Sequence, residues 1–90
     1  MMRFEEIISL RNEDIPTVYR ELTPSTLAAA LKDAPAEVAK KFFGNMPSDM
    51  AAMIKQVMET LGNLSGAKVE AERRKVLELV KSLKAQHKIG

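Results

Sequence analysis

Apolar residues recur every three to four positions between residues 46 and 61, which is the period of an α-helix with one buried face. Gly62 follows the last apolar position and ends the predicted helix. The apolar set is Met46, Met50, Met53, Ile54, Val57, Met58 and Leu61. The opposite face carries Ser48, Ala52, Lys55, Gln56 and Glu59, with Asp49 on its flank. We expect a core face through Met50, Ile54, Val57, Met58 and Leu61; a methionine-rich binding groove is the alternative interpretation of the same stripe.

Three prolines at nearly equal intervals, Pro24, Pro35 and Pro47, each precede a run of helix-forming residues. Proline suits the first helical position, because a helix makes no use of the N–H there. The hydroxyl of Thr23 is a suitable N-cap for the segment 23–33. The next segment, 35–43, ends at Gly44-Asn45, a typical helix stop.

Two further elements precede these segments and one follows them. Residues 4–10 form a short apolar helix candidate, and Asn12 is the expected N-cap of a helix over 13–22. Residues 67 to about 87 form the longest predicted helix. Its apolar stripe consists of Val69, Val76, Leu77, Val80 and Leu83. Its expected ion pairs on the exposed side are Glu70–Arg74, Glu72–Lys75 and Glu78–Lys81.

No segment alternates apolar and polar residues with the period of two that a half-buried strand requires. The pattern therefore predicts an all-α fold, a compact bundle or superhelix of about six short helices with the longest at the C-terminal end. At 90 residues the chain fits one domain, which we assign to residues 1–90.

The composition removes most kinds of catalytic site. There is no cysteine, and His87 is the only histidine. Thiol chemistry and multi-histidine metal sites are therefore excluded, and we expect no catalytic residue, metal, cofactor or small-molecule substrate. No stretch approaches the roughly 20 apolar residues of a membrane span, so we expect a cytoplasmic protein that meets a membrane only through a partner.

The net charge of +2 arises at the C-terminal end, where residues 68–90 hold 7 basic and 3 acidic side chains. A basic helix invites a nucleic-acid interpretation, since phosphate binding needs clustered positive charge. Glu70, Glu72 and Glu78 are interleaved with the basic residues and offset much of this charge. A solvated amphipathic helix is therefore the favoured interpretation, and nucleic-acid binding is not expected.

Several short motifs, in order and almost without gaps, resemble the C-terminal domain of the flagellar motor switch protein FliG. Residues 4–8 (Phe-Glu-Glu-Ile-Ile) are similar to the family's Phe-Glu-Asp-Ile helix, and residues 19–22 (Tyr-Arg-Glu-Leu) are similar to its Leu-Arg-Glu-Val motif. Residues 27–32 (Leu-Ala-Ala-Ala-Leu-Lys) and 41–46 (Lys-Phe-Phe-Gly-Asn-Met) resemble its next two motifs. Each fragment alone is weak, whereas their shared order and spacing are specific.

The resemblance implies a non-enzymatic part of the flagellar rotor, at the cytoplasmic face of the inner membrane in the basal body. In this family, charged residues on one helix meet the cytoplasmic loop of the stator and transmit torque, and other surfaces join neighbouring rotor switch proteins. Contacts between exposed charges suit this work, because each is weak and can be made and broken quickly.

The family's charge pattern is only partly kept. Lys32 matches the family's lysine, but Asp49 stands where the family has arginine, and Gln56-Val57 replaces an acidic pair. We therefore place the stator-facing edge at Lys32, Asp49, Lys55 and Glu59. The alternatives are a divergent member that generates no torque, a stand-alone helical adaptor, and a nucleic-acid binder through the basic C-terminal helix.

Overall fold

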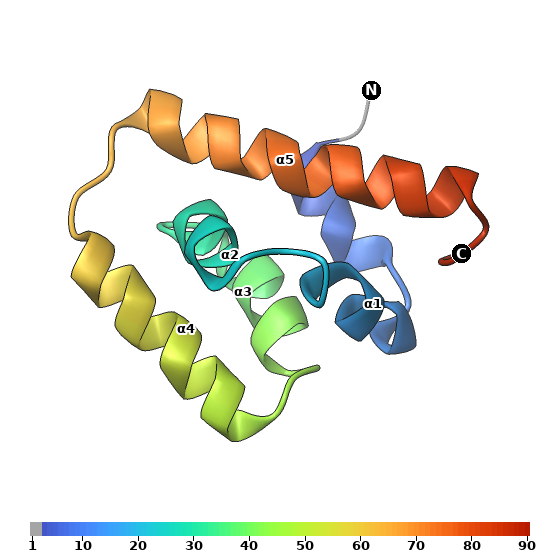
Figure 1. The fold of residues 1–90 in the computed structure, drawn as a ribbon, viewed down its shortest axis with the longest axis horizontal. Coiled ribbons are helices and arrows are strands. Elements are labelled where there is room, and N and C mark those ends of the chain that lie inside the picture. The colour runs from blue at the N-terminus through green and yellow to red at the C-terminus, as the bar shows by residue number, and fades with distance from the viewer. Residues whose placement is uncertain (1–2) are drawn as a thin grey trace.

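The computed structural model describes residues 3–90, and every regular element within them is a helix. Two short 3₁₀ helices come first, followed by five α-helices (Figure 1). Their bounds are η1 (Phe4–Ser9), η2 (Asn12–Asp14), α1 (Ile15–Tyr19), α2 (Pro24–Leu31), α3 (Ala36–Phe43), α4 (Ser48–Leu61) and α5 (Gly66–Ala85). The all-α expectation is confirmed, and α5 is the longest helix, with 20 residues.

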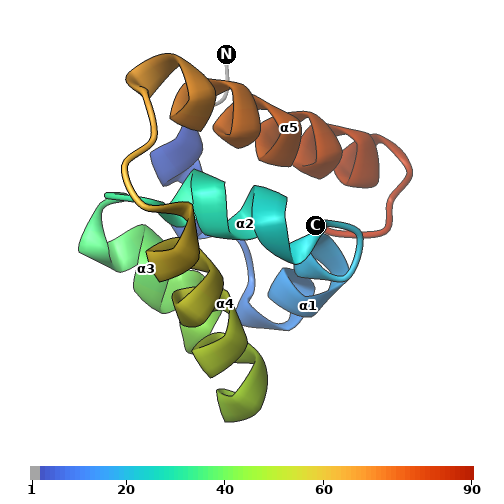
Figure 2. The same cartoon turned by 60° about the vertical axis from the view of Figure 1, so that its left-hand side comes forward.

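The short helix α2 lies at the centre, between α5 on one side and α4 on another (Figures 1 and 2). Its residues from Leu27 to Leu31 are all buried. Three of these five are alanines, whose small side chains let neighbouring helices approach closely. The remaining core comes from every other α-helix and from η1; its largest fully buried side chains include Ile7, Ile15, Val38, Phe42, Ile54, Val76, Val80 and Leu83.

The proline-based helix starts are largely confirmed. Pro24 occupies the first position of α2, and the Thr23 hydroxyl accepts a hydrogen bond from the Thr26 N–H at 3.1 Å. Pro35 and Pro47 stand one residue earlier than expected, at the N-caps of α3 and α4. An N-cap is not yet helical, so the ring meets no steric conflict there either.

The N-terminal elements differ from the expectation. Residues 4–9 form a 3₁₀ rather than an α-helix, and the helix expected over 13–22 is divided into η2 and the five-residue α1. An α-helix from residue 13 needs a hydrogen bond from residue 16 to the Asn12 carbonyl, and Pro16 has no N–H to donate. Asn12 is not a cap; its side-chain oxygen accepts a hydrogen bond from Lys41 at 2.8 Å instead.

The helix α4 has the expected core face, with one correction. Ile54 is fully buried, and Met50, Val57, Met58 and Leu61 are partly buried against the core. Met53 is 42% exposed, although the apolar stripe included it. At 100° per residue, it lies about 80° from the centre of the buried face, where packing ends. Gly62 ends the helix as expected, at a positive φ of 62°.

The C-terminal end of α5 reverses direction at His87. This residue adopts a left-handed φ of 57° and is exposed. Its N–H donates to the Lys84 carbonyl at 3.0 Å, and the Lys88 N–H donates to the Leu83 carbonyl at 2.9 Å, the pair of bonds that defines a Schellman turn. The reversal returns Ile89 to the core, where it is buried.

The two neighbouring residues Met53 and Ile54 test the core face of α4. Replacing Ile54 with alanine removes fully buried methyl and methylene groups and should lower the free energy of unfolding by about 2–5 kcal/mol. The control, Met53→Ala, removes a side chain that is 42% exposed and should cost much less. Urea unfolding followed by circular dichroism measures both; equal losses would show that α4 does not bury Ile54 preferentially.

Candidate protein-interaction surface

The outward side of α4 is the most continuous exposed surface that carries predicted site residues. On a helical wheel the exposed positions occupy an arc of about 160°. They are Ser48, Asp49, Ala52, Met53, Lys55, Gln56, Glu59 and Thr60. We call this set the outer face of α4. Lys55 and Glu59 lie on one edge of it, and Asp49 lies near the middle, in the first turn.

The three charges of the outer face have different local settings. The Asp49 carboxylate accepts a hydrogen bond from the Met50 N–H at 2.9 Å, in the first turn, where the helix dipole favours an acid. The Lys55 ammonium lies over the Phe43 ring, 5.0 Å from its centroid. Within residues 3–90, none of the three charges forms an ion pair. Their charges therefore remain open to solvent and to a partner.

Lys32 lies on a different element from the other predicted site residues. It is the C-cap of α2, half-buried, and Asp33 after it has a left-handed φ of 53°. The structure thus brings Asp49, Lys55 and Glu59 together on one helix and places Lys32 at the end of the helix on which α4 packs.

Two neighbouring residues of α5, Glu72 and Arg73, have settings that the sequence patterns did not predict. Glu72 is buried rather than on the exposed side of the helix, and Arg73 hydrogen-bonds to the C-terminal end of α2. The Glu72 carboxylate pairs with Lys68 at 2.9 Å and Lys75 at 3.1 Å. Hydrogen bonding from Lys68 lowers the pKa of Glu72, with further lowering from Lys75 and the Thr26 hydroxyl, while burial opposes the shift. Glu72 has the same helical spacing as the apolar stripe of α5, and this spacing could have indicated that its side chain is buried.

Arg73 joins α5 to the C-terminal end of α2. Its guanidinium donates from Nε to the Ala30 carbonyl and from Nη2 to the Lys32 carbonyl, both at 2.9 Å. It also pairs with Glu70 at 3.6 Å, which replaces the expected Glu70–Arg74 pair. The expected Glu72–Lys75 and Glu78–Lys81 pairs are confirmed, the latter at 3.8 Å.

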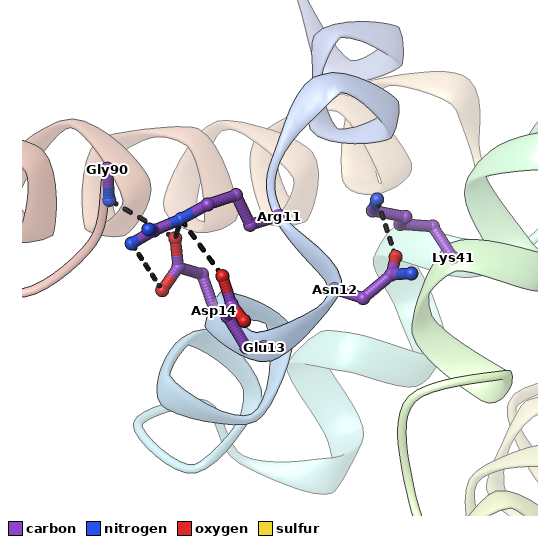
Figure 3. Close-up of polar contacts among 6 residues, drawn as sticks. All are labelled: Arg11, Asn12, Glu13, Asp14, Lys41 and Gly90. Carbon is purple, nitrogen blue, oxygen red and sulfur yellow. Dashed lines mark hydrogen bonds and ion pairs between the residues drawn. The ribbon is translucent and has the colours of Figure 1, made fainter.

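A third polar cluster joins the start of α1 to the C-terminal end of the chain (Figure 3). The buried Asp14 carboxylate accepts hydrogen bonds from Arg11 Nε at 3.0 Å and from the Gly90 N–H at 3.1 Å. These two donors, Arg11 foremost, hold the pKa of Asp14 below its usual range. The cluster fastens the chain after His87 to the N-terminal elements.

A groove of about 610 Å³ lies between η1 and α5, and its lining is mixed in charge. Phe4 and Leu77 contribute its apolar part; the charged lining residues are Arg3, Glu5, Glu70, Arg73, Arg74, Glu78 and Lys81. Four of these already pair with one another, as Glu70–Arg73 and Glu78–Lys81. Residues 3–90 contain no group of three or more histidine and acidic side chains placed to hold a metal ion.

The fold is therefore that of a small all-helical domain with an exposed, charged outer face on α4. A model of the FliG C-terminal domain family matches residues 1–90, and the chain belongs to this family. It is 37% identical over 89 residues to the flagellar motor switch protein FliG of Borreliella burgdorferi, and 35% identical over 83 residues to that of Thermotoga maritima.

Solved structures of the same family agree with the fold. A crystal structure of a FliG fragment from H. pylori superimposes with a TM-score of 0.95 at 31% identity, covering 99% of this chain and 39% of that one. Full-length FliG from Aquifex aeolicus gives 0.87 at 30% identity, covering 92% of this chain and 26% of that one. The family is one of flagellar motor switch components rather than of enzymes, as the sequence resemblance implied.

The chain spans about a quarter of the length of these curated relatives, with 99% of it matching 26% of the Borreliella protein and 92% of it matching 25% of the Thermotoga protein. Within residues 3–90, no helix is both long and apolar enough to cross a membrane.

The Asp14 cluster predicts a specific loss of stability in acid. A carboxyl group whose pKa is lower in the folded than in the unfolded chain stabilises the fold while it is ionised. Its contribution is complete above the unfolded pKa, 3.8 for an ordinary aspartate, and disappears as the pH falls through the lower folded value. Asp14→Asn should therefore lower the melting temperature at pH 7 and reduce the further drop between pH 5 and 2.

The matched control is Glu13→Gln, which removes the neighbouring exposed carboxylate, 3.4 Å from Arg11. This variant should melt close to the unaltered chain at pH 7 and keep its acid sensitivity. Melting temperatures of the three proteins from pH 7 to pH 2 decide the matter. An acid-induced drop in Asp14→Asn as large as in the unaltered chain would contradict the account.

Proposed function

We propose that this chain works on the rotor of the bacterial flagellum and receives force from the stator through electrostatic contacts. Its membership of the FliG C-terminal domain family supports this proposal. The observation that carries it is the outer face of α4, whose three charged side chains have no ion-pair partner within residues 3–90. Residues 1–90 would form one such domain.

The proposed contact surface consists of Lys32, Asp49, Lys55 and Glu59. Exposed ion pairs contribute typically less than about 1 kcal/mol each and are screened by salt, so they form and separate without trapping the two partners. A moving stator loop that carries charges of the opposite sign can therefore pull on one charge after another. No covalent chemistry is needed on the rotor side.

The sign of Asp49 specifies what the partner must carry. In the family resemblance an arginine stands at this position, and like charges held close cost free energy. A stator loop that works with this chain would therefore present a basic residue where Asp49 passes. Near Lys32 it would present an acidic residue.

The partners that we propose are the cytoplasmic loop of the stator and neighbouring rotor switch proteins. The site of action would be the cytoplasmic face of the inner membrane, in the flagellar basal body. The comparisons give no support to a nucleic-acid binder, and the acidic residues interleaved along α5 argue against one. The buried Glu72 carboxylate pairs with Lys68 and Lys75 and neutralises part of their positive charge.

Charge reversal in motile cells tests the proposal. Lys32→Glu and Asp49→Lys should each reduce swimming speed, while the purified domain stays folded, because exposed charges rarely contribute more than about 1 kcal/mol to stability. The control is Lys84→Glu, which reverses an exposed charge on α5 that forms no ion pair within residues 3–90. It should leave swimming unchanged.

A compensating reversal on the stator loop should restore swimming to Lys32→Glu or Asp49→Lys. Tracking of single cells measures swimming speed, and circular dichroism confirms the fold of each purified variant. Normal swimming in both variants would show that no torque passes through this surface, and a role as a helical scaffold would then replace the proposal.

A further inference from the structure

The guanidinium of Arg73 is held by three different elements at once. It donates to the Ala30 and Lys32 carbonyls at 2.9 Å each, at the C-terminal end of α2. It lies over the Phe4 ring of η1, 5.0 Å from the ring centroid, and pairs with Glu70 on its own helix at 3.6 Å. Only 18% of its side chain is exposed. Few orientations satisfy all of these contacts together.

The two carbonyls belong to the last turn and the C-cap of α2, where no following N–H of the helix is available to them. Because one planar guanidinium donates to both, it fixes the direction of the peptide groups as well as their distance. The backbone of Lys32 is therefore set by Arg73. The chain then turns sharply, since Asp33 has a left-handed φ of 53°.

A lysine side chain has four rotatable bonds, and ordering it against a partner costs free energy. That cost grows if the backbone beneath it also moves. A backbone fixed before contact presents the ammonium from one place and leaves only the side chain to be ordered. Arg73 supplies this fixation from α5, with most of its own side chain buried.

We propose that Arg73 is a positioning residue for Lys32: it holds the C-terminal end of α2 so that the Lys32 ammonium is presented to the partner surface. The proposal rests on the function proposed above for Lys32. The buried hydrogen bonds between α5 and α2 would then serve partner binding as well as the fold.

The test compares Arg73→Gln and Arg73→Lys with the matched control Arg74→Gln. Arg74 is the exposed neighbour on the same helix and forms no ion pair or side-chain hydrogen bond within residues 3–90. Reductive methylation with ¹³C-formaldehyde places a label on every lysine, and NMR then follows Lys32 and, as an internal reference, Lys55 on α4.

In Arg73→Gln the Lys32 methyl signals should move toward those of a lysine in an unfolded peptide, and the Lys55 signals should stay in place. The Ala34 N–H, which donates to the Leu31 carbonyl at 3.1 Å, should exchange with solvent about tenfold faster. Arg73→Lys keeps the charge but lacks the planar fork, so it should show the same changes to a smaller extent. Arg74→Gln should show neither change.

Unchanged Lys32 signals in a folded Arg73→Gln protein would overturn the proposal. If that variant does not fold, Arg73→Lys decides, and Lys32 signals at their original position would overturn the proposal equally.

In cells, Arg73→Gln should slow swimming, and combining it with Lys32→Met should slow swimming no further than Lys32→Met alone. Fully additive losses would also overturn the proposal. Normal swimming in Lys32→Met would instead remove the proposed function, while the NMR result would still decide whether Arg73 positions Lys32.

Discussion

The structure depends on burying the part of α2 from Leu27 to Leu31 while still satisfying the polar groups at the ends of the helix. A helix surrounded by protein has no water for its free N–H and C=O groups, and unpaired groups there are costly. The Thr23 hydroxyl accepts a hydrogen bond from an N–H of the first turn, and Arg73 on α5 donates hydrogen bonds to carbonyls at the C-terminal end. Glu72, the neighbour of Arg73, lies near Thr26 at the other end. The acidic side chain thus faces the positive end of the helix dipole and the basic one the negative end.

This central arrangement determines which surfaces remain outside. The helix α4 packs against α2 and buries Ile54, so the opposite side of α4, with Asp49, Lys55 and Glu59, faces solvent. Lys32 lies at the C-terminal end of α2. In the function proposed above, the contact charges must be carried on a backbone that does not yield under force. The Arg73 contacts and the Asp14 cluster supply that rigidity, by joining α5 to α2 and the C-terminal end to α1.

The sequence predicted much of the fold, because most of its helices have local signals. The Met46–Leu61 period, Pro24 with Thr23, and Gly62 identified α2 and α4 closely. Local patterns failed where a distant contact decides: Asn12 was taken as a cap, but Lys41 occupies its oxygen. Met53 belongs to the apolar stripe by its spacing but is 42% exposed, because it lies at the edge of the buried face. Of the candidate surface, the three residues of α4 were brought together as expected. The roles of Arg73 and Asp14 depend on residues 41 to 76 positions away, which no local pattern contains.

The proposed contact between the outer face of α4 and the stator can be tested by cross-linking in motile cells. Gln56→Cys places a thiol at the middle of this face, and Ser82→Cys places one on the exposed side of α5 as a reference. A bifunctional thiol reagent and a cysteine in the stator loop then report contact. We expect cross-links from position 56 and none from position 82. Cross-links from position 82 alone, or from neither position, would contradict it.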